Sequence, residues 1–383
     1  MEKTYTIYIA CPLYVVPYLK QELEELGFKT EDENFTGVFI KGTYNDVVTL
    51  NYALRTANRV LLLVDTFFSR DQKDLFNKLK KINWADYFSA DKYISFTSQT
   101  NHHSINNSMF LNQLCKDAVV DYFTSNFKKR PNSGPLKSEV VLHVHWHDNK
   151  AWVYLDTSGE QLHKHNYRLN PFMAPVQENL AAALIMATGW NKQTTFVNPM
   201  CGSGTFAIEA ALMAANKMPS LLRDNFSFMH YNMYDESFAK DYATKLATQV
   251  NENDLPQIIA TDVESSAIRA ARENAGRAGV EHLINFQRCD FSETPIPEGD
   301  GVVIINPPYG ERLGEEEDLI LLYKSIGDFL KRQCTGKTAF IFTGQANLAK
   351  KIGLKATRRM EFFNGPIECR LLKYEMYIGS REK

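Results

Sequence analysis

The most informative chemical motif in the sequence is Asn306-Pro307-Pro308-Tyr309, which follows an apolar segment at 302–305 that is typical of a buried strand. Two prolines fix the turn and remove two backbone donors, so its carbonyl groups can face a ligand. The exocyclic amine of a nucleobase is a poor nucleophile, because its lone pair is delocalised into the ring. The Asn306 side-chain oxygen and the Pro307 carbonyl can accept its two hydrogens and leave the lone pair aimed at a sulfonium methyl group. Tyr309 can then stack on the base, so the motif predicts methyl transfer to a base amine.

A second motif joins an apolar segment at 195–197 to a predicted helix: Asn198-Pro199-Met200-Cys201-Gly202-Ser203-Gly204-Thr205. Small residues between a strand and a helix allow backbone N–H groups to approach a ligand at the helix N-terminus. Dinucleotide enzymes, kinases and methyltransferases share such turns. This motif alone therefore predicts a cofactor site and leaves the cofactor open.

Two carboxylates follow the next two predicted strands, Asp262 after 258–260 and Asp290 after 284–286. The carboxyl ends of parallel strands meet at one edge of a sheet, where a carboxylate can accept the hydroxyl groups of an adenosine ribose. We include Val263 and Phe291, which directly follow them, among the predicted cofactor-binding residues. Asn306 lies at the same edge and is included as well.

Cysteine and metal chemistry are the alternatives at these positions. Cys201 and Cys289 lie near the predicted site, but an amine target needs no covalent adduct, so neither enters the mechanism. The six cysteines are scattered singly and predict neither a disulfide framework nor a zinc site. His143, His145 and His147 share one face of a predicted strand; with no carboxylate or thiolate close in sequence, we interpret them as a polar sheet face.

The net charge of −2 does not mark the chain as a nucleic-acid-binding protein, so local patches matter more than the total. Two stretches lack acidic residues. We predict that they contact RNA, with a solvated surface as the alternative for each. Their basic residues are Lys128, Lys129 and Arg130 in the first stretch and Lys350, Lys351, Arg358 and Arg359 in the second.

The elements that position the site lie in the second half of the chain, where short apolar strands alternate with helices. Strands predicted at 195–197, 258–260, 284–286, 302–305 and 339–342 are separated by helices at 207–215, 267–278 and 318–332. Continuous apolar runs indicate strands buried on both faces, so we expect an α/β fold with a parallel sheet covered by helices. Segments 355–362 and 371–378 are predicted to close one edge as a hairpin.

The first half predicts an α+β region, an open sheet with helices on one face. Strands are expected at 5–9, 34–41, 60–67 and 92–98, helices at 16–26, 44–55, 71–82 and 105–127, and a hairpin with arms at 139–147 and 151–156. A connector at 157–175 follows. No apolar run reaches the roughly 20 residues of a membrane helix, and the first residues lack the apolar stretch of a signal peptide, so a cytoplasmic protein is expected.

Taken together, the chain resembles the THUMP-domain methyltransferases that form N2-methylguanosine in large-subunit ribosomal RNA. The resemblance covers essentially the whole chain, more loosely before residue 157. It is carried by the two motifs already quoted, by 208–211, by Asp262 with 267–268 and 274–275, by Gly310-Glu311-Arg312, by Phe363-Asn364-Gly365-Pro366-Ile367-Glu368-Cys369-Arg370-Leu371, and by Tyr167-Arg168, 174–175 and 178–183.

The resemblance implies a domain order and a set of roles. It implies a ferredoxin-like segment (1–43), a THUMP RNA-binding domain (44–156) and a Rossmann-like, seven-stranded class I methyltransferase domain (176–383). S-adenosylmethionine would be the cofactor, with its methionine end at 199–205, its ribose at Asp262 and its adenine at Asp290. Residues 306–309 would hold the target base, and ribosomal RNA would be the partner.

The chain departs from the family at three places. Asn198 stands where the family often has Asp, and His165-Asn166 stand where it tends to read Lys-Arg-Gly. An insert at 221–250, with a helix from about residue 235, is either a substrate wall or a structural excursion. The alternatives in function are a transfer-RNA guanine methyltransferase, a DNA adenine-N6 methyltransferase, and a non-catalytic RNA-binding assembly factor.

Overall fold

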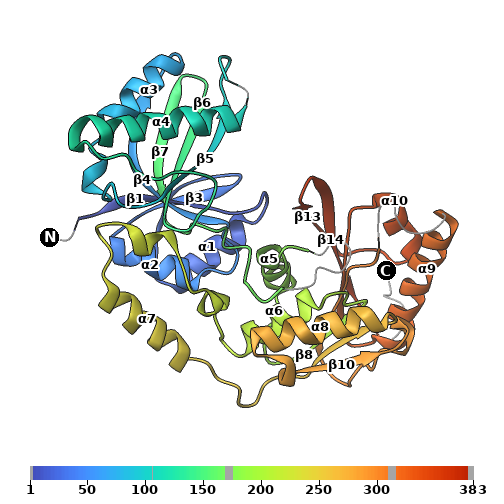
Figure 1. The fold of residues 1–383 in the computed structure, drawn as a ribbon. Helices are drawn as coiled ribbons and strands as arrows, with labels where there is room; N and C mark the ends of the chain where they lie inside the picture. The colour runs from blue at the N-terminus through green and yellow to red at the C-terminus, as the bar shows by residue number, and fades with distance from the viewer. Residues whose placement is uncertain (1–2, 106, 169–175, 309–315, 378–383) are drawn as a thin grey trace. The chain divides into compact units, whose positions relative to one another are not determined.

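The computed structural model describes residues 3–105, 107–168, 176–308 and 316–377 of the chain. The chain divides into two compact units. Unit 1 comprises residues 1–11, 20–162 and 223–245, and unit 2 comprises residues 12–19, 163–222 and 246–383. Each unit contains its own seven-stranded sheet (Figure 1). Among the described residues, no helix combines the length and the apolar character needed to cross a membrane.

Unit 1 is built on one sheet with the strand order β2-β3-β1-β4-β7-β6-β5. All neighbours in it are antiparallel except β5 and β6, which run parallel. The strands are β1 (Tyr5–Ala10), β2 (Thr30–Asn34), β3 (Gly37–Gly42), β4 (Arg59–Phe68), β5 (Ile94–Asn101), β6 (Val140–His147) and β7 (Lys150–Asp156). The segments predicted to be ferredoxin-like and THUMP therefore share a continuous sheet.

The two faces of this sheet differ in polarity, as alternation along the strands requires. On β6, Leu142, Val144 and Trp146 are fully buried, whereas His145 is partly exposed and His147 is exposed. The apolar face is covered by helices. They are α1 (Val16–Glu25), of which residues 20–25 belong to unit 1, α2 (Tyr44–Ala53), α3 (Gln72–Lys81) and α4 (Ser108–Phe127). The predicted polar face of the hairpin is accessible at His145 and His147, whereas Val141 and His143 on the same face are buried.

Strand β2 is a strand of this sheet that the sequence did not predict. Its residues, Thr-Glu-Asp-Glu-Asn, are exposed along nearly the whole strand, so no apolar alternation marks it. It pairs with β3 at the sheet edge, and charged side chains there discourage pairing with another chain. The strand predicted at 34–41 begins instead at Gly37, after the turn that joins β2 to β3.

Unit 2 contains a mixed sheet with the order β10-β9-β8-β11-β12-β14-β13. The strands are β8 (Thr195–Pro199), β9 (Ile258–Asp262), β10 (Ile284–Arg288), β11 (Gly301–Ile305), β12 (Thr338–Thr343), β13 (Arg358–Asn364) and β14 (Ile367–Glu375). The first five in spatial order are parallel, and β14 is antiparallel to both of its neighbours. The predicted closing hairpin is confirmed, with its second arm lying inside the first.

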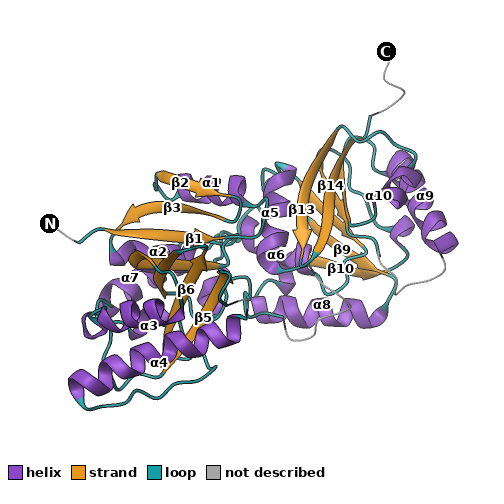
Figure 2. Cartoon of the chain, turned by 90° about the horizontal axis from the view of Figure 1, so that it is seen from above, coloured by secondary structure: helices purple, strands orange, loops and turns teal. Residues whose placement is uncertain are grey.

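Helices cover both faces of this sheet, which explains its continuous apolar strands (Figure 2). They are α5 (Glu178–Thr188), α6 (Thr205–Ala214), α8 (Ser265–Ala278), α9 (Glu316–Gln333) and the short α10 (Ala346–Ala349). On one face, Tyr323, Ile326 and Leu330 of α9 pack with Val303 and Ile341 in the core. The strand order reverses at β8, with β9 and β10 on one side and β11 and β12 on the other. In open α/β sheets, ligands bind beside such a reversal, at the carboxyl ends of the strands.

The insert after α6 packs within unit 1, not as a separate element of unit 2. Residues 223–245 belong to unit 1, and α7 (Glu236–Thr248) begins there close to the predicted position. Phe226 and Phe228 are fully buried. The Arg223 guanidinium donates to three backbone carbonyls, those of Ser158, Glu160 and Gln161. These contacts support the structural interpretation of the insert.

Candidate active site

The predicted cofactor and base residues meet at one edge of the sheet in unit 2. Strands β10, β9, β8 and β11 run parallel, with Arg288 beside Asp262 and Pro199 beside Thr261 in register. Met200, Asp290 and Asn306 follow the ends of three of these strands. The topology therefore brings together residues that lie more than a hundred positions apart in the sequence.

The turn after β8 has an unusual backbone that leaves room for a ligand. Met200, Gly202 and Gly204 all have positive φ, of 56°, 55° and 83°. At Gly204 a Cβ would lie 2.9 Å from the Cβ of Ala271 on α8, so only glycine fits there. A Cβ on Gly202 would meet nothing within 4 Å. Met200 is a strained residue in this conformation, and such strain gathers at functional turns.

Asp262 holds this turn in place. Its Oδ2 accepts a hydrogen bond of 2.9 Å from the Gly202 N–H, and its Oδ1 accepts one of 3.0 Å from the Glu264 N–H. A carboxylate can accept about four hydrogen bonds, so two ribose hydroxyl groups would still find acceptors. The neighbouring Val263 side chain is 54% exposed at the same edge.

Asp290 is exposed and begins the short helix η5 (Phe291–Glu293). Its Oδ1 accepts hydrogen bonds from the Ser292 N–H and hydroxyl, at 2.9 and 2.6 Å. This leaves its other oxygen for a ligand. Phe291 is buried, and its ring packs edge-on against Phe329, so it supports the core beneath the site.

Asn306 directly follows β11 and carries the clearest sign of a missing partner. Its Oδ1 atom is buried and accepts no hydrogen bond from any described residue. A buried acceptor without a donor costs about 1–3 kcal/mol, so a bound group that donates here would be favoured. Pro307 is buried beside it and Pro308 is partly exposed. Tyr309 lies outside the described residues.

The position of Asn198 accounts for an asparagine where the family often has aspartate. The side chain is fully buried at the end of β8, and its Nδ2 donates to the Ile304 carbonyl of β11 at 3.0 Å. A carboxylate has no hydrogen to donate in this place. The amide thus joins the two strands on which the cofactor turn and the base motif are built.

A buried polar cluster that the sequence did not predict contacts helix α6, which directly follows the cofactor turn. Glu209 of α6 is fully buried, and its Oε1 accepts from the Tyr167 hydroxyl at 2.8 Å and lies 2.7 Å from the His165 Nδ1. The Arg168 guanidinium donates to the Thr205 hydroxyl at 2.9 Å. Asn166 has a φ of 62°, a conformation that asparagine tolerates, at the position where the family tends to have glycine. Tyr167, Arg168 and Glu209 all lie in the segments that carry the family resemblance. The sequence therefore singled out these residues but did not predict their structural role.

The two cysteines near the site are protonated thiols at neutral pH. Burial and the neighbouring Asp262 raise the pKa of Cys201 well above its ordinary value. Burial also raises the pKa of Cys289. Neither is an activated nucleophile, in agreement with their exclusion from the mechanism. Within the described residues, no group of three or more His, Cys, Asp or Glu side chains could hold a metal ion.

The two basic stretches lie in different units. In unit 1, Lys128 ends α4 with a φ of 56°, and Lys129 forms an exposed ion pair with Asp91. In unit 2, Lys350 and Lys351 lie in the short helix η6 (Lys350–Ile352), while Arg358 and Arg359 begin β13. All of these side chains and that of Arg130 are exposed, as an RNA-contacting surface requires.

Three family models match the chain. They are the RMKL-like methyltransferase domain over residues 165–373, the RlmL ferredoxin-like domain over 6–61 and the THUMP domain over 69–156. The chain is 35% identical over 98% of its length to "Ribosomal RNA large subunit methyltransferase K/L" of Syntrophotalea carbinolica, and covers 54% of that protein. It therefore spans about half the length of this relative.

Two other similar proteins match along almost their full length. One is a candidate RNA methyltransferase of Synechocystis sp., 34% identical, with 93% of each chain covered. The other is the crystal structure of SMU.472, a candidate methyltransferase complexed with SAH, with a TM-score of 0.89, 27% identity, and 99% and 100% of the two chains covered. The similarity thus extends over both units of the chain.

Proposed function

The chain belongs to the RMKL-like methyltransferase family, with an RlmL ferredoxin-like domain and a THUMP domain, and we propose that it methylates the exocyclic N2 amine of a guanine in large-subunit ribosomal RNA. An S-adenosylmethionine-dependent methyltransferase is the class that the family and the fold support. The guanine and its amine are the finer part of the proposal, which rests on the family resemblance.

Residues at the carboxyl ends of β8, β9 and β10 would hold S-adenosylmethionine. Residues 199–205 would surround its methionine end, Asp262 would accept from its ribose, and Asp290 would lie at its adenine. The open space at Gly202 and the spare acceptor positions of both carboxylates fit this group. When bound, it supplies a methyl group on a positively charged sulfur. The SAH found in SMU.472 is the demethylated form of the same cofactor.

The observation that carries the proposal is the buried Asn306 Oδ1 without a donor. An amine that bears two hydrogens can donate one to this oxygen and the other to the Pro307 carbonyl. Both contacts orient the nitrogen lone pair and become stronger as the amine gains positive charge during transfer. Tyr309 would stack on the base. This arrangement needs no nucleophile from the protein, consistent with the protonated state of Cys201.

RNA is the proposed partner, with unit 1 supplying affinity and unit 2 supplying chemistry. The THUMP match and the name of the K/L relatives support ribosomal RNA. The proposed division of the chain remains a ferredoxin-like segment over 1–43, a THUMP domain over 44–156, a connector over 157–175 and a methyltransferase domain over 176–383. Lys128, Lys129 and Arg130 are the proposed phosphate contacts of unit 1.

The experiment that tests this function is mass spectrometry of nucleosides from cells with and without the protein. We expect N2-methylguanosine to fall in large-subunit ribosomal RNA and to return on complementation with the wild type but not with Asn306→Ala. A loss confined to transfer RNA would favour a transfer-RNA guanine methyltransferase. A loss of N6-methyladenine from DNA would favour a DNA enzyme. Unchanged nucleosides, with no cofactor bound in calorimetry, would favour a non-catalytic assembly factor.

A further inference from the structure

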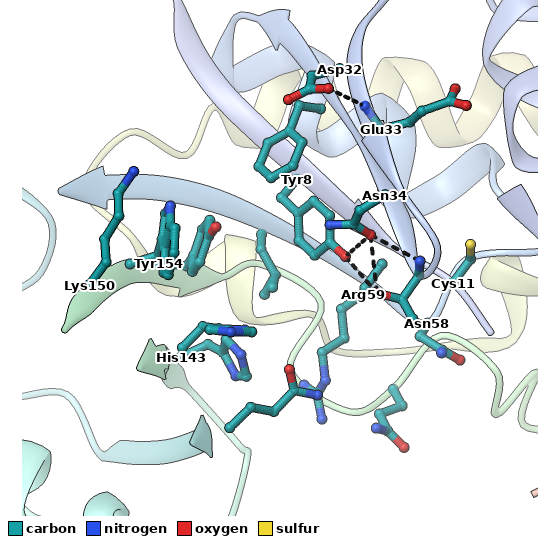
Figure 3. A pocket seen from close by; sticks show the side chains of 18 residues that line it. Tyr8, Cys11, Asp32, Glu33, Asn34, Asn58, Arg59, His143, Lys150 and Tyr154 are labelled. Carbon is teal, nitrogen blue, oxygen red and sulfur yellow. Dashed lines mark hydrogen bonds between the residues drawn. The ribbon is translucent and has the colours of Figure 1, made fainter. Parts of the chain in front are cut away.

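The open face of the unit 1 sheet contains a cavity of about 740 Å³ whose walls come from unit 1 alone. Alternation along the strands turns apolar residues such as Ile7 and Ile9 toward the helices and leaves Tyr8 on the open face. Strand register then aligns the lining residues in rows, such as Gln99, His145 and Trp152, or Tyr8 and Phe39. Figure 3 shows the Tyr8, Tyr154 and His143 side chains around this cavity.

Aromatic rings form the cavity's apolar surface. Tyr8 and Phe39 lie with their ring centroids 4.6 Å apart, and Tyr154 lies 6.3 Å from Tyr8. Trp152 is partly exposed, and the Lys150 amine lies 4.8 Å from its ring centroid. Lys150 is exposed and has a long, flexible side chain. A flat ligand can therefore displace its amine from the Trp152 ring. Partly exposed aromatic rings on an open sheet are the surface on which unpaired nucleobases stack.

Hydrogen-bonding groups surround these rings. The amide groups of Gln99 and Gln161 form no hydrogen bond with any described residue. The Asn34 Oδ1 accepts from the Tyr8 hydroxyl and the Thr36 N–H, and its amide nitrogen donates to no described residue. Amide side chains offer both donors and acceptors, the combination that the edge of a base requires.

The charges of the cavity favour a base over a phosphate cluster. Asp32 and Glu33 lie on its wall, and the Arg59 guanidinium is paired with the buried Asp156. Burial lowers the pKa of His143 to about 3, so this imidazole is neutral at pH 7 and hydrogen-bonds with the Thr97 hydroxyl at 2.8 Å. Lys150 is the lining cation for which the structure gives no acidic partner among the described residues. A single available cation beside aromatic rings can bind the phosphate of one nucleotide whose base stacks on those rings.

We propose that this cavity binds an unpaired nucleobase of the substrate RNA, separate from the base that is methylated, by stacking it on Tyr8 and Trp152. The inference rests on the proposed function only in taking RNA as the substrate. The amides of Gln99 and Gln161 bind the edge of the base, and Lys150 binds its phosphate. The site thus selects RNA that carries an unpaired nucleotide in addition to the methylated one.

Tryptophan fluorescence gives a direct test, because Trp152 alone among the four tryptophans is accessible. Trp84 and Trp146 are fully buried and Trp190 is 7% exposed. The probe is a labelled single-stranded oligoribonucleotide of mixed sequence, compared with its duplex and with the same backbone lacking bases. We expect quenching by the single strand and not by the other two. Trp152→Phe should remove the quenching while label anisotropy still reports binding.

Two alanine variants define the site further. Tyr8→Ala should weaken binding of the single strand at least about fivefold, the lower end for loss of one base-stacking contact. Phe110→Ala is the matched control, since this exposed aromatic residue lies on α4 and not in the cavity. The cavity would be excluded as the binding site if the single strand bound without quenching the Trp152 fluorescence and with equal affinity for the wild type and Tyr8→Ala. The proposed function would then still stand. Failure to bind any RNA would overturn both.

Discussion

At the residue scale, Asn306 is assigned mainly to the target amine and Asp262 to the cofactor, so their loss should have separable effects. Asn306→Ala removes an acceptor for the target amine and leaves the cofactor turn intact. We expect an almost unchanged Kd for S-adenosylmethionine and a fall in turnover on the order of 10²-fold or more, as for other lost transition-state contacts. Calorimetry and single-turnover methyl transfer would measure the two quantities.

Asp262→Ala is the matched contrast to this variant. It removes the proposed ribose acceptor and the hydrogen bond that holds Gly202. Cofactor affinity should fall, with turnover recovering as the cofactor concentration rises. Full turnover in Asn306→Ala, or an unchanged cofactor Kd in Asp262→Ala, would refute the corresponding assignment.

Asn198 gives a prediction about stability at the same scale. Asn198→Asp places a carboxylate without a hydrogen against the Ile304 carbonyl in a fully buried position. We expect the free energy of unfolding to fall by about 1–3 kcal/mol or more, the cost of burying an unsatisfied polar group. Denaturant unfolding would measure it, with Asn285→Asp on the exposed side of β10 as the control. Equal stability of the two variants would show that the hydrogen bond from the Asn198 amide to the Ile304 carbonyl does not stabilise the fold.

At the scale of elements, residues 223–245 of the insert stabilise β6. The Ser227 hydroxyl accepts from the Val141 N–H at 3.0 Å and donates to the Glu139 carbonyl at 2.6 Å. Ser227→Ala leaves two backbone groups without these partners, so unfolding should become easier by about 1–3 kcal/mol. Hydrogen exchange at Val141 would report the local effect. Ser125→Ala, on the exposed face of α4, should leave both measurements unchanged. Equal effects of the two substitutions would show that Ser227 does not stabilise β6.

Strands with a continuous apolar pattern could be predicted from the sequence, and the polar strand could not; the apolar helix α5 was not predicted either. Strands β8 and β11 are continuous apolar runs and were found close to their observed bounds, whereas β2 is exposed and polar and was missed. The residues at strand ends, Asp262 and Asn306, were predictable because parallel strands deliver them to one edge. The pairing of His165 with Glu209 was not, because the two residues are 44 positions apart and meet only through packing.

At the scale of the whole molecule, RNA affinity is assigned to unit 1. Reversing Lys128, Lys129 and Arg130 to glutamate should weaken RNA binding and flatten its salt dependence, since each phosphate contact contributes about one unit of slope. The lost ion pair between Lys129 and Asp91 is exposed, so stability should change little. Binding titrations at several salt concentrations would measure both the affinity and the slope. Cofactor affinity serves as the internal control, and an unchanged RNA affinity would move the contact surface to Lys350, Lys351, Arg358 and Arg359.

The central claim is that the methyl group goes to the N2 amine of a guanine. The most direct measurement is methyl transfer to an RNA in which inosine replaces the target guanosine, once mass spectrometry has located that nucleotide. Inosine lacks this amine and keeps the rest of the base, so the RNA should still bind. We predict that transfer disappears while RNA affinity stays within about twofold, a change of less than 0.5 kcal/mol. Methylation of the inosine RNA at the same nucleotide would contradict the account.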